Sequence, residues 1–314
     1  MLKNIIKIFL FFLIKLFPKN KKLLVFGDRA GIRYADNSRY LFLYLNKFHK
    51  EYECIWLTKE KKIYDYLKSQ NYKCEISSSL KGIYYALRAN YHLYNFVEND
   101  INKLITTFSK SILLWHGVLP KKLKTYTLKN NKKKLIHKLT KKYFLYPNKI
   151  MSENILDHFP KEKYDLLLSN LPRNIILNDK CNYKNYLRTD DENKFVYELK
   201  QKKMKIFGYF PTWRANGLEL FGDVKNLNKF DELNSNLKKT NSIILIKRHM
   251  NSDVKDKHPL YNQNIEKISS YLESLSNFKF VNYEFDLNSI LGICDILISD
   301  YSGVIFDYLY LDKP

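Results

Sequence analysis

Short apolar runs alternate with amphipathic stretches along most of the chain. The run at 22–27 ends in glycine and has the character of a buried strand, and residues 37–48 carry the apolar spacing of a helix. The same reasoning predicts strands at 54–57, 91–97, 111–115, 205–210, 242–246 and 295–298, and helices at 61–69 and 304–311. Strands that alternate with helices form a parallel sheet, so the pattern predicts an α/β protein.

The length of 314 residues indicates two domains, because domains average roughly 150 residues. A polar stretch that begins at 178 interrupts the alternation, and a second series of strands begins at 205. We expect two Rossmann-like domains at 21–177 and 205–314, joined by a linker at 178–204. The second domain should be incomplete at its C-terminus, because no further helices follow 304–311.

The N-terminal residues 1–20 have the character of a membrane-contact helix. The apolar run Ile5–Phe17 is interrupted by Lys7 and Lys15, and it is shorter than the roughly 20 residues that a spanning helix needs. Its phenylalanines can enter the acyl boundary while flanking lysines, Lys19 among them, attract anionic lipid. An amphipathic helix in the plane of the cytoplasmic membrane surface is predicted, with a signal-peptide remnant or a buried helix as alternatives.

Positive charge dominates the composition. Lys and Arg number 54 against 32 Asp and Glu, a net charge of +22 that favours anionic partners such as phospholipid or a polyphosphate chain. Residues 121–149 carry many lysines and no acidic residue, interleaved with apolar positions. This basic segment is either a solvated face or a surface for a membrane or polyanion.

The four cysteines are Cys54, Cys74, Cys181 and Cys294. Their spacing fits neither a CxxC pair nor a zinc site, and it does not indicate a disulfide framework. A reducing cytoplasm and a chain without a metal or cofactor are the simplest interpretation.

Polar groups follow four predicted strands, at 115–117, 210–214, 247–249 and 299–303. Open α/β sheets bind ligands at the carboxyl ends of their strands, so we expect these groups to meet in a cleft between the two domains. His116 can take a proton from an alcohol near neutral pH, and a structural histidine that caps a strand is the alternative.

The groups in the second half suit a phosphorylated ligand. His249 stands beside Lys247 and Arg248, and cations with imidazole N–H donors stabilise phosphate oxygens. Arg214 can form a bidentate contact with phosphate, or it is a surface ion pair. Thr212 and Ser302 carry small hydroxyls that can bind phosphate, and the Ser302-Gly303 turn before a helix can form an anion site or a plain helix cap. Asp300 and Asp307 are carboxylates that can bind a metal or a ribose hydroxyl.

Taken together, these segments resemble the CDP-glycerol glycerophosphotransferase family, the teichoic acid primases and polymerases, whose fold is similar to that of GT-B glycosyltransferases. The matching motifs are Tyr34-Ala35-Asp36-Asn37-Ser38, Trp115-His116-Gly117-Val118-Leu119-Pro120-Lys121-Lys122, Leu171-Pro172-Arg173-Asn174, Pro211-Thr212-Trp213-Arg214 and Ser299-Asp300-Tyr301-Ser302-Gly303-Val304-Ile305-Phe306-Asp307.

The resemblance implies that His116 and His249 are catalytic, with Gly117 in the acceptor-side motif and Arg214, Asp300 and Ser302 around the donor. It implies transfer of glycerol phosphate from CDP-glycerol to a lipid-linked anionic polymer at the cytoplasmic membrane face, with no nucleic acid as partner. Gly303 and Met250 stand where the family usually has serine and proline, which leaves CDP-ribitol or another polyol donor open. Two further functions stay open, a GT-B capsule glycosyltransferase and a non-catalytic, membrane-bound polyanion-binding protein.

Overall fold

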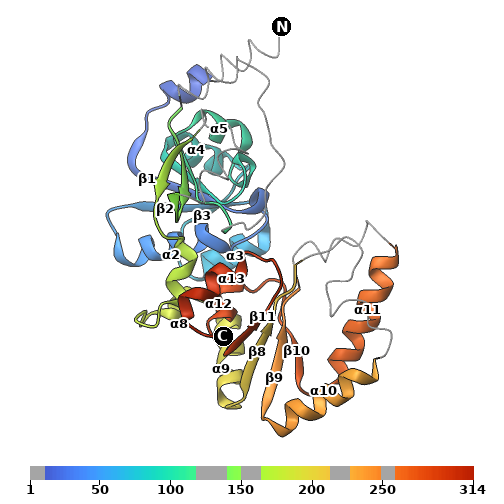
Figure 1. Ribbon diagram of the computed structural model, residues 1–314. Helices are drawn as coiled ribbons and strands as arrows, with labels where there is room; N and C mark the ends of the chain where they lie inside the picture. Colours follow the sequence, from blue (N-terminus) through green and yellow to red (C-terminus); the bar gives the residue numbers. More distant parts are fainter. Residues whose placement is uncertain (1–10, 118–139, 150–163, 213–226, 249–258) are drawn as a thin grey trace. The chain divides into compact units, whose positions relative to one another are not determined.

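A computed structural model describes residues 11–117, 140–149, 164–212, 227–248 and 259–314. The chain divides into two compact units, Met1–Ile175 and Ile176–Pro314. Each unit is built around a sheet in which every recorded strand pair is parallel (Figure 1). The α/β prediction is therefore confirmed.

In the first unit, the described residues form a seven-stranded sheet in the order β3-β2-β1-β4-β5-β6-β7. The chain runs outward from β1 to β3 and then returns to place β4 against the other side of β1. This reversal makes the β1/β4 boundary the point where a doubly wound sheet opens for a ligand. The strands are β1 Asn20–Gly27, β2 Glu53–Thr58, β3 Cys74–Ile76, β4 Ala89–Tyr94, β5 Ser111–Leu113, β6 Lys142–Tyr146 and β7 Asp165–Leu168.

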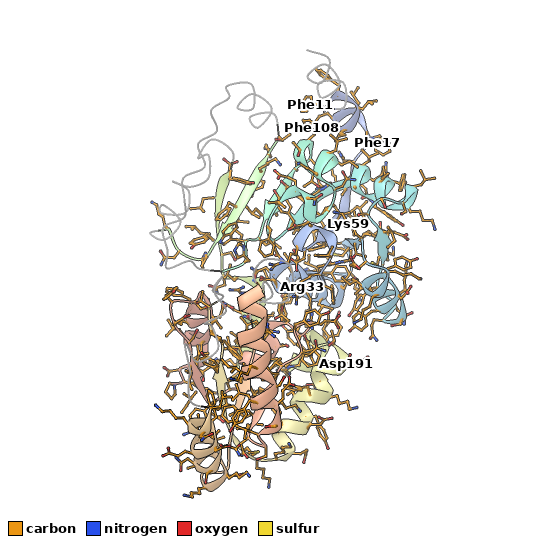
Figure 2. All side chains as sticks on the ribbon, turned by 90° about the vertical axis from the view of Figure 1, so that its right-hand side faces the viewer. Phe11, Phe17, Arg33, Lys59, Phe108 and Asp191 are labelled. Carbon is orange, nitrogen blue, oxygen red and sulfur yellow. The ribbon has the colours of Figure 1, made fainter. Side chains whose placement is uncertain are left out.

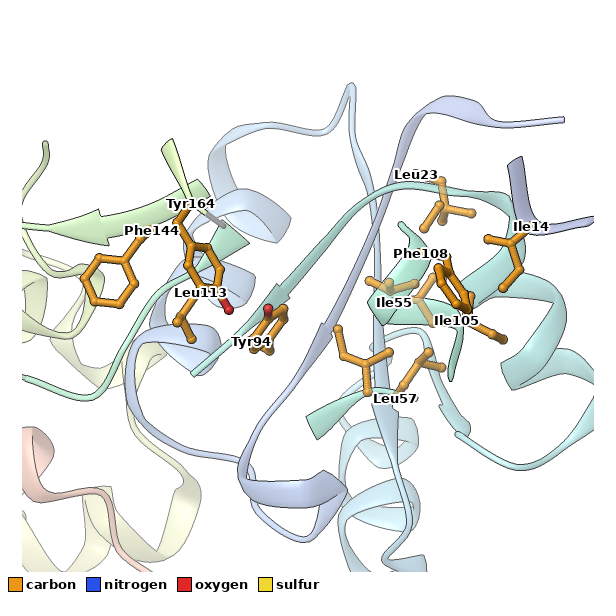
Figure 3. Close-up of a cluster of buried hydrophobic side chains, with 14 of the residues drawn as sticks. Ile14, Leu23, Ile55, Leu57, Tyr94, Ile105, Phe108, Leu113, Phe144 and Tyr164 are labelled. Carbon is orange, nitrogen blue, oxygen red and sulfur yellow. The ribbon is translucent and has the colours of Figure 1, made fainter. Parts of the chain in front are cut away.

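Both faces of this sheet are covered because side chains alternate along each strand. Val25 and Ile55 belong to a buried cluster with Phe108 of α5 (Figure 3). On the other face, the Phe42 ring of α2 lies 5.5 Å from Phe26 and 5.6 Å from Trp56, between ring centroids. The helices of this unit are α2 Asp36–Phe48, α3 Lys61–Ser69, α4 Leu80–Arg88 and α5 Lys103–Phe108, with short 3₁₀ turns η1 Arg29–Gly31 and η2 Glu98–Asp100.

The second unit repeats the same construction on a smaller scale. Its described strands are ordered β10-β9-β8-β11, with α10 and α11 packed on one face of the sheet (Figure 1). The strands are β8 Lys205–Tyr209, β9 Ser242–Ile246, β10 Phe278–Phe280 and β11 Ile296–Ile298. The helical segments are η3 Pro172–Leu177 at the unit boundary, α8 Lys184–Leu187, α9 Asp190–Gln201, α10 Asn228–Lys239, α11 Pro259–Ser274, α12 Leu287–Leu291, α13 Val304–Tyr308 and η5 Leu309–Leu311.

The stretch expected as a linker, 178–204, contains α8 and α9. Thr189 caps α9 in a reciprocal capping box with Glu192, which stabilises an isolated helix start. The helix buries Phe195 and Leu199, four positions apart on one face. The acidic first turn of this helix gave the sequence its linker-like polarity.

Part of the basic segment is a buried strand. Lys142 begins β6, and its ammonium lies 3.2 Å from a carboxylate oxygen of Glu98 and donates to the carbonyl of Thr106 at 3.3 Å. With its side chain fully buried, Lys142 offers no charge to a membrane or polyanion. Residues 118–139 of the segment lie outside the described residues.

The N-terminal helix uses one face to pack on the protein. Residues 11–16 are helical, Ile14 is buried in the main core cluster, and the Phe11 and Phe108 rings lie 5.7 Å apart (Figures 2 and 3). Lys19 donates to the carbonyl of Leu87 at 2.6 Å, and burial, followed by the charge of Lys15, lowers its pKa to about 8. Lys19 therefore does not reach outward as expected. No helix of the described chain has the length and apolar content for a membrane crossing.

Candidate active site

In the first unit, the carboxyl ends of β1, β4 and β5 gather polar groups at one edge of the sheet. Asn95, directly after β4, donates to Asp28 at 2.9 Å, and Asp28 directly follows β1. The Asn95 side-chain oxygen accepts the backbone N–H of Ser38 at 3.0 Å and its hydroxyl at 3.1 Å. This amide thereby ties the point where the strand order reverses to the first turn of α2.

Buried carboxyls give this edge unusual electrostatics. Burial raises the pKa of Asp28 well above its ordinary value, and the nearby Asp36 carboxylate raises it further. Burial also raises the pKa of Asp100, whose oxygens accept the backbone N–H groups of Ala30 and Phe96. Asp100 thus fixes the loop after β1, while Asp28 is a carboxyl that holds its proton more strongly than usual.

His116 lies three residues beyond the end of β5. Its ring stacks on Phe96 with centroids 4.3 Å apart and an interplanar angle of 15°, and it contacts Trp115 at 4.1 Å. Stacking covers a face of the imidazole, and the ring nitrogen Nδ1 is buried, so Nε2 is the nitrogen that we assign to proton transfer. The sequence correctly placed His116 at the carboxyl edge of the sheet.

The backbone that carries His116 follows an uncommon path. Trp115 has φ 59° and Gly117 has φ 132°, both in the left-handed region. A Cβ on Gly117 would lie 2.5 Å from a guanidinium nitrogen of Arg173. The positive φ favours glycine at 117, and a side chain there would in addition displace the Arg173 guanidinium.

Two side chains from distant motifs hold this turn. Asn37 donates to the carbonyl of Trp115 at 2.9 Å and accepts the backbone N–H of Arg173 at 3.0 Å. Arg173 donates to the carbonyl of His116 at 2.8 Å and pairs with Asp36 at 3.2 Å. Both motifs were recognised in the sequence, but no role was predicted for Asn37 or Arg173.

In the second unit, the carboxyl ends of the adjacent strands β8 and β11 bring two predicted residues together. Thr212 donates to one Asp300 carboxylate oxygen from its hydroxyl, and its backbone N–H donates to the same oxygen at 3.1 Å. Ser299 donates to the carbonyl of Phe210 at 2.7 Å and reinforces the junction. Convergence of these strand ends was expected from the sequence.

The other predicted donor-side residues are placed less simply. The buried Lys247 ammonium donates to the carbonyls of Asn282 and Tyr283 at 3.2 and 3.4 Å, and Arg248 follows it at the end of β9. The Ser302 hydroxyl accepts the Val304 N–H at 3.4 Å, Gly303 precedes α13, and Asp307 is buried within that helix. The candidates Arg214 and His249 lie outside the described residues.

Comparison with known proteins identifies the family. Residues 8–314 match the CDP-glycerol:poly(glycerophosphate) glycerophosphotransferase family. The chain belongs to this family. The resemblance drawn from the motifs is confirmed, and with it the assignment of the protein as a glycerophosphotransferase.

Relatives of this glycerophosphotransferase extend over its whole length. The teichoic acid poly(glycerol phosphate) polymerase of Bacillus spizizenii is 28% identical over 97% of this chain and 75% of its own. The teichoic acid glycerol-phosphate transferase of Staphylococcus aureus is 25% identical over 100% of this chain and 78% of its own. The solved wall teichoic acid polymerase TagF shares the fold, with a TM-score of 0.65 and 22% identity over 100% of this chain and 76% of that one.

The cysteines, all of which lie in described parts of the chain, show no reactive site in this glycerophosphotransferase. All four cysteines are free and buried, and burial raises the pKa of Cys54, Cys74 and Cys294 to about 12, which leaves these thiols unreactive. Among the described residues, no group of three His, Cys, Asp or Glu side chains is arranged to hold a metal ion.

Proposed function

We propose that this enzyme transfers glycerol phosphate from CDP-glycerol to a hydroxyl of a lipid-linked wall or capsule polymer and releases CMP. The observation that carries the proposal is the His116 ring, stacked on Phe96 at the carboxyl edge of the first sheet. A neutral imidazole there removes the acceptor proton as its oxygen bonds to the glycerol-bearing phosphorus, and the bond from that phosphorus to CMP breaks.

The donor belongs at the second sheet. Asp300 is a poor neighbour for a diphosphate because like charges repel, so we assign it to a hydroxyl of the ribose or the glycerol. Thr212 orients this carboxylate from two donors on one oxygen. Arg248, His249, Arg214 and the Ser302–Gly303 turn are the groups that we assign to the phosphates.

A screen of CMP or nucleotide release tests the donor. CDP-glycerol, CDP-ribitol and UDP-sugars are each supplied with a short synthetic glycerol-phosphate acceptor, and CDP-glycerol is expected to give at least about tenfold higher kcat/KM than the others. Preference for CDP-ribitol would mean that ribitol phosphate is the transferred group. Turnover of a UDP-sugar would mean that the enzyme is a glycosyltransferase. Release from no donor would favour a binding protein.

Membrane contact is proposed for the outer face of the N-terminal helix. Phe12, Leu13 and Leu16 are exposed at 56%, 49% and 79%, while Phe11 and Ile14 of the same helix pack inward. Fully burying one large apolar side chain contributes roughly 1.5–3 kcal/mol, so three of them suffice for reversible attachment to a bilayer. This face supports a peripheral location at the membrane, and the cytoplasmic side of it remains our prediction from the sequence.

Substituting Phe12→Ser and Leu16→Ser together should lower sedimentation with anionic vesicles by about tenfold or more, because both side chains leave the acyl boundary. Leu309→Ser, at an exposed apolar position of the second unit, is the matched control and should bind as wild type. Deleting the whole segment is a poorer test because Ile14 belongs to the core. Unchanged sedimentation of the double variant would reject the helix as the membrane contact.

A further inference from the structure

The turn that carries His116 is held by side chains from two segments far away in the sequence. Asn37, in the first turn of α2, reaches the carbonyls of Leu114 and Trp115 at 3.3 and 2.9 Å. Arg173, at the other end of the unit's sequence, reaches the carbonyl of His116 at 2.8 Å. The three consecutive carbonyls before Gly117 are therefore each bound by one of these two residues.

The two side chains also hold each other. The Asn37 oxygen accepts the backbone N–H of Arg173 at 3.0 Å, and Asp36 pairs with the Arg173 guanidinium at 3.2 Å. Asn37 is fully buried, and the Arg173 side chain is 8% exposed. Buried side chains that are each held by more than one hydrogen bond have little freedom to move, which makes them rigid supports.

The hydrogen bonds from Asn37 and Arg173 hold the turn at Trp115 in an unfavourable backbone conformation. Trp115 is a bulky residue at φ 59°, a backbone region that is unfavourable for such residues and persists where neighbouring contacts fix it. Without the bonds to its carbonyls, the turn can leave the left-handed conformation and carry the imidazole off Phe96. A shift of about 1 Å in a catalytic group can cost on the order of 100-fold in rate.

We infer that Arg173 and Asn37 are positioning residues that set the orientation of the His116 imidazole through the backbone of its turn. The inference rests on the proposed role of His116 as the base. It predicts that both residues act on turnover through His116 and leave donor binding unchanged.

The first test observes His116 without any substrate. In isotope-labelled protein, the His116 ring signals are identified by their loss in His116→Ala, and the stacked Phe96 ring displaces them through its ring current. Arg173→Lys should move these signals, as should Asn37→Asp, which keeps the acceptor for Arg173 but loses the donor to the carbonyls. Signals that stay at their wild-type positions in both variants would overturn the inference.

Matched controls exist for both changes. Arg188 is a buried arginine of the second unit that donates to the carbonyl of Ser289 at 3.1 Å, and Asn46 of α2 donates to the carbonyl of Phe42 at 2.8 Å. Arg188→Lys and Asn46→Asp remove comparable backbone-anchoring bonds away from the turn. They should leave the His116 signals unmoved.

The second test is kinetic. Arg173→Lys should lower kcat for CMP release by roughly 10- to 100-fold with KM for CDP-glycerol within about twofold of wild type. In the His116→Ala background the same change should cost nothing further, because a misplaced base and a missing base have the same effect. An undiminished loss in that background would assign Arg173 a separate role and overturn the inference.

The two tests fail separately. If wild-type protein releases no CMP from CDP-glycerol, the proposed function is wrong, while the NMR measurement still decides whether Arg173 and Asn37 orient His116. If Arg173→Lys does not fold, as judged by loss of cooperative unfolding, Asn37→Asp decides the inference by the same two measurements.

Discussion

The two sheets present their carboxyl edges in different ways. In the first unit, four of the five described non-glycine residues with left-handed torsion angles lie at the carboxyl edge, namely Arg29, Ala30, Asp36 and Trp115, with φ between 42° and 59°. The fifth, Asn71, follows the end of α3. In the second unit, the described non-glycine residues with such angles each follow the end of a helix or 3₁₀ turn, and they are Lys203, Asn241 and Asp312. Left-handed backbone in the first unit therefore lies mainly at the edge that carries His116, whereas in the second unit it lies at ordinary helix ends.

The difference fits two kinds of chemical task. A proton-transferring group must be held within a fraction of an ångström, and strained backbone with buried contacts provides that. Donor binding distributes its energy over several contacts and tolerates small movements. The contacts at the second edge, Thr212 with Asp300 and Ser299 with Phe210, are formed without left-handed residues at those positions.

The largest expected effect is on turnover, and it comes from replacing the histidine that follows each sheet edge, His116 in the first unit and His249 in the second. His116→Ala should lower turnover by roughly 100-fold or more with near-normal affinity for CDP-glycerol, because a general base acts in the transition state. His249→Ala should weaken donor affinity as well as turnover. Calorimetry with CDP-glycerol and CMP release measure both, with circular dichroism as the folding check. A folded His116→Ala enzyme with normal turnover would contradict the assignment of His116 as the general base.

A smaller effect is expected at the second edge. Asp300→Ala should raise KM for CDP-glycerol by about tenfold with a lesser change in kcat, because the ribose or glycerol hydroxyl loses a charged hydrogen-bond acceptor. Asp179→Ala, at an exposed acidic residue of the same unit, serves as control. A fall in kcat without any change in KM would place Asp300 at the reacting atoms instead.

Relieving strain should have opposite consequences at the two kinds of position. Lys203→Gly should stabilise the protein by about 0.5–1 kcal/mol and leave turnover unchanged, because glycine adopts φ near 49° freely. Asp36→Gly relieves a similar angle but removes the partner of Arg173, so turnover should fall by roughly tenfold. Chemical denaturation and CMP release test the pair. Equal activity of both variants would contradict the proposed contrast.

The smallest effect concerns the pH dependence of stability. The pKa of Asp28 is raised in the folded protein, so above its ordinary value near 3.8 the folded chain holds a proton that the unfolded chain has lost. Stability from this group is therefore greatest at low pH and declines as pH rises from the ordinary pKa toward the raised one. Asp28→Asn should remove that decline and gain stability over wild type between about pH 4 and neutrality. Denaturation profiles that stay parallel across this range would rule out the effect.

Much of the fold could be predicted from local pattern. The strand at 242–246 and the helix at 61–69 agree with β9 and α3 to the residue, because compact apolar runs and amphipathic spacing are local properties. Strand β6 was hidden by the lysines around it, and α9 was hidden by its acidic first turn. In both cases a tertiary partner, Glu98 for Lys142 and the backbone of Asp286 for Glu192, makes a polar residue compatible with burial.

The candidate site divides in the same way. The sequence placed His116, Thr212 and Asp300 at strand ends, because parallel strands must present their carboxyl ends together. It could not assign Asn37 and Arg173 their contacts, since 136 positions separate the amide from the backbone N–H that it binds. Nor could it show that Lys247 is turned toward two carbonyls or that Lys19 is turned inward.

The sequence alone therefore determined the α/β class, the family and the order of the polar strand ends, because each is written in short runs of residues. The tertiary structure decided which face of the N-terminal helix remains exposed, which lysines are buried and which side chains hold the His116 turn. Those outcomes depend on which distant segments pack together, and hydrogen bonds and desolvation act over a few ångströms in space, whatever the separation along the chain.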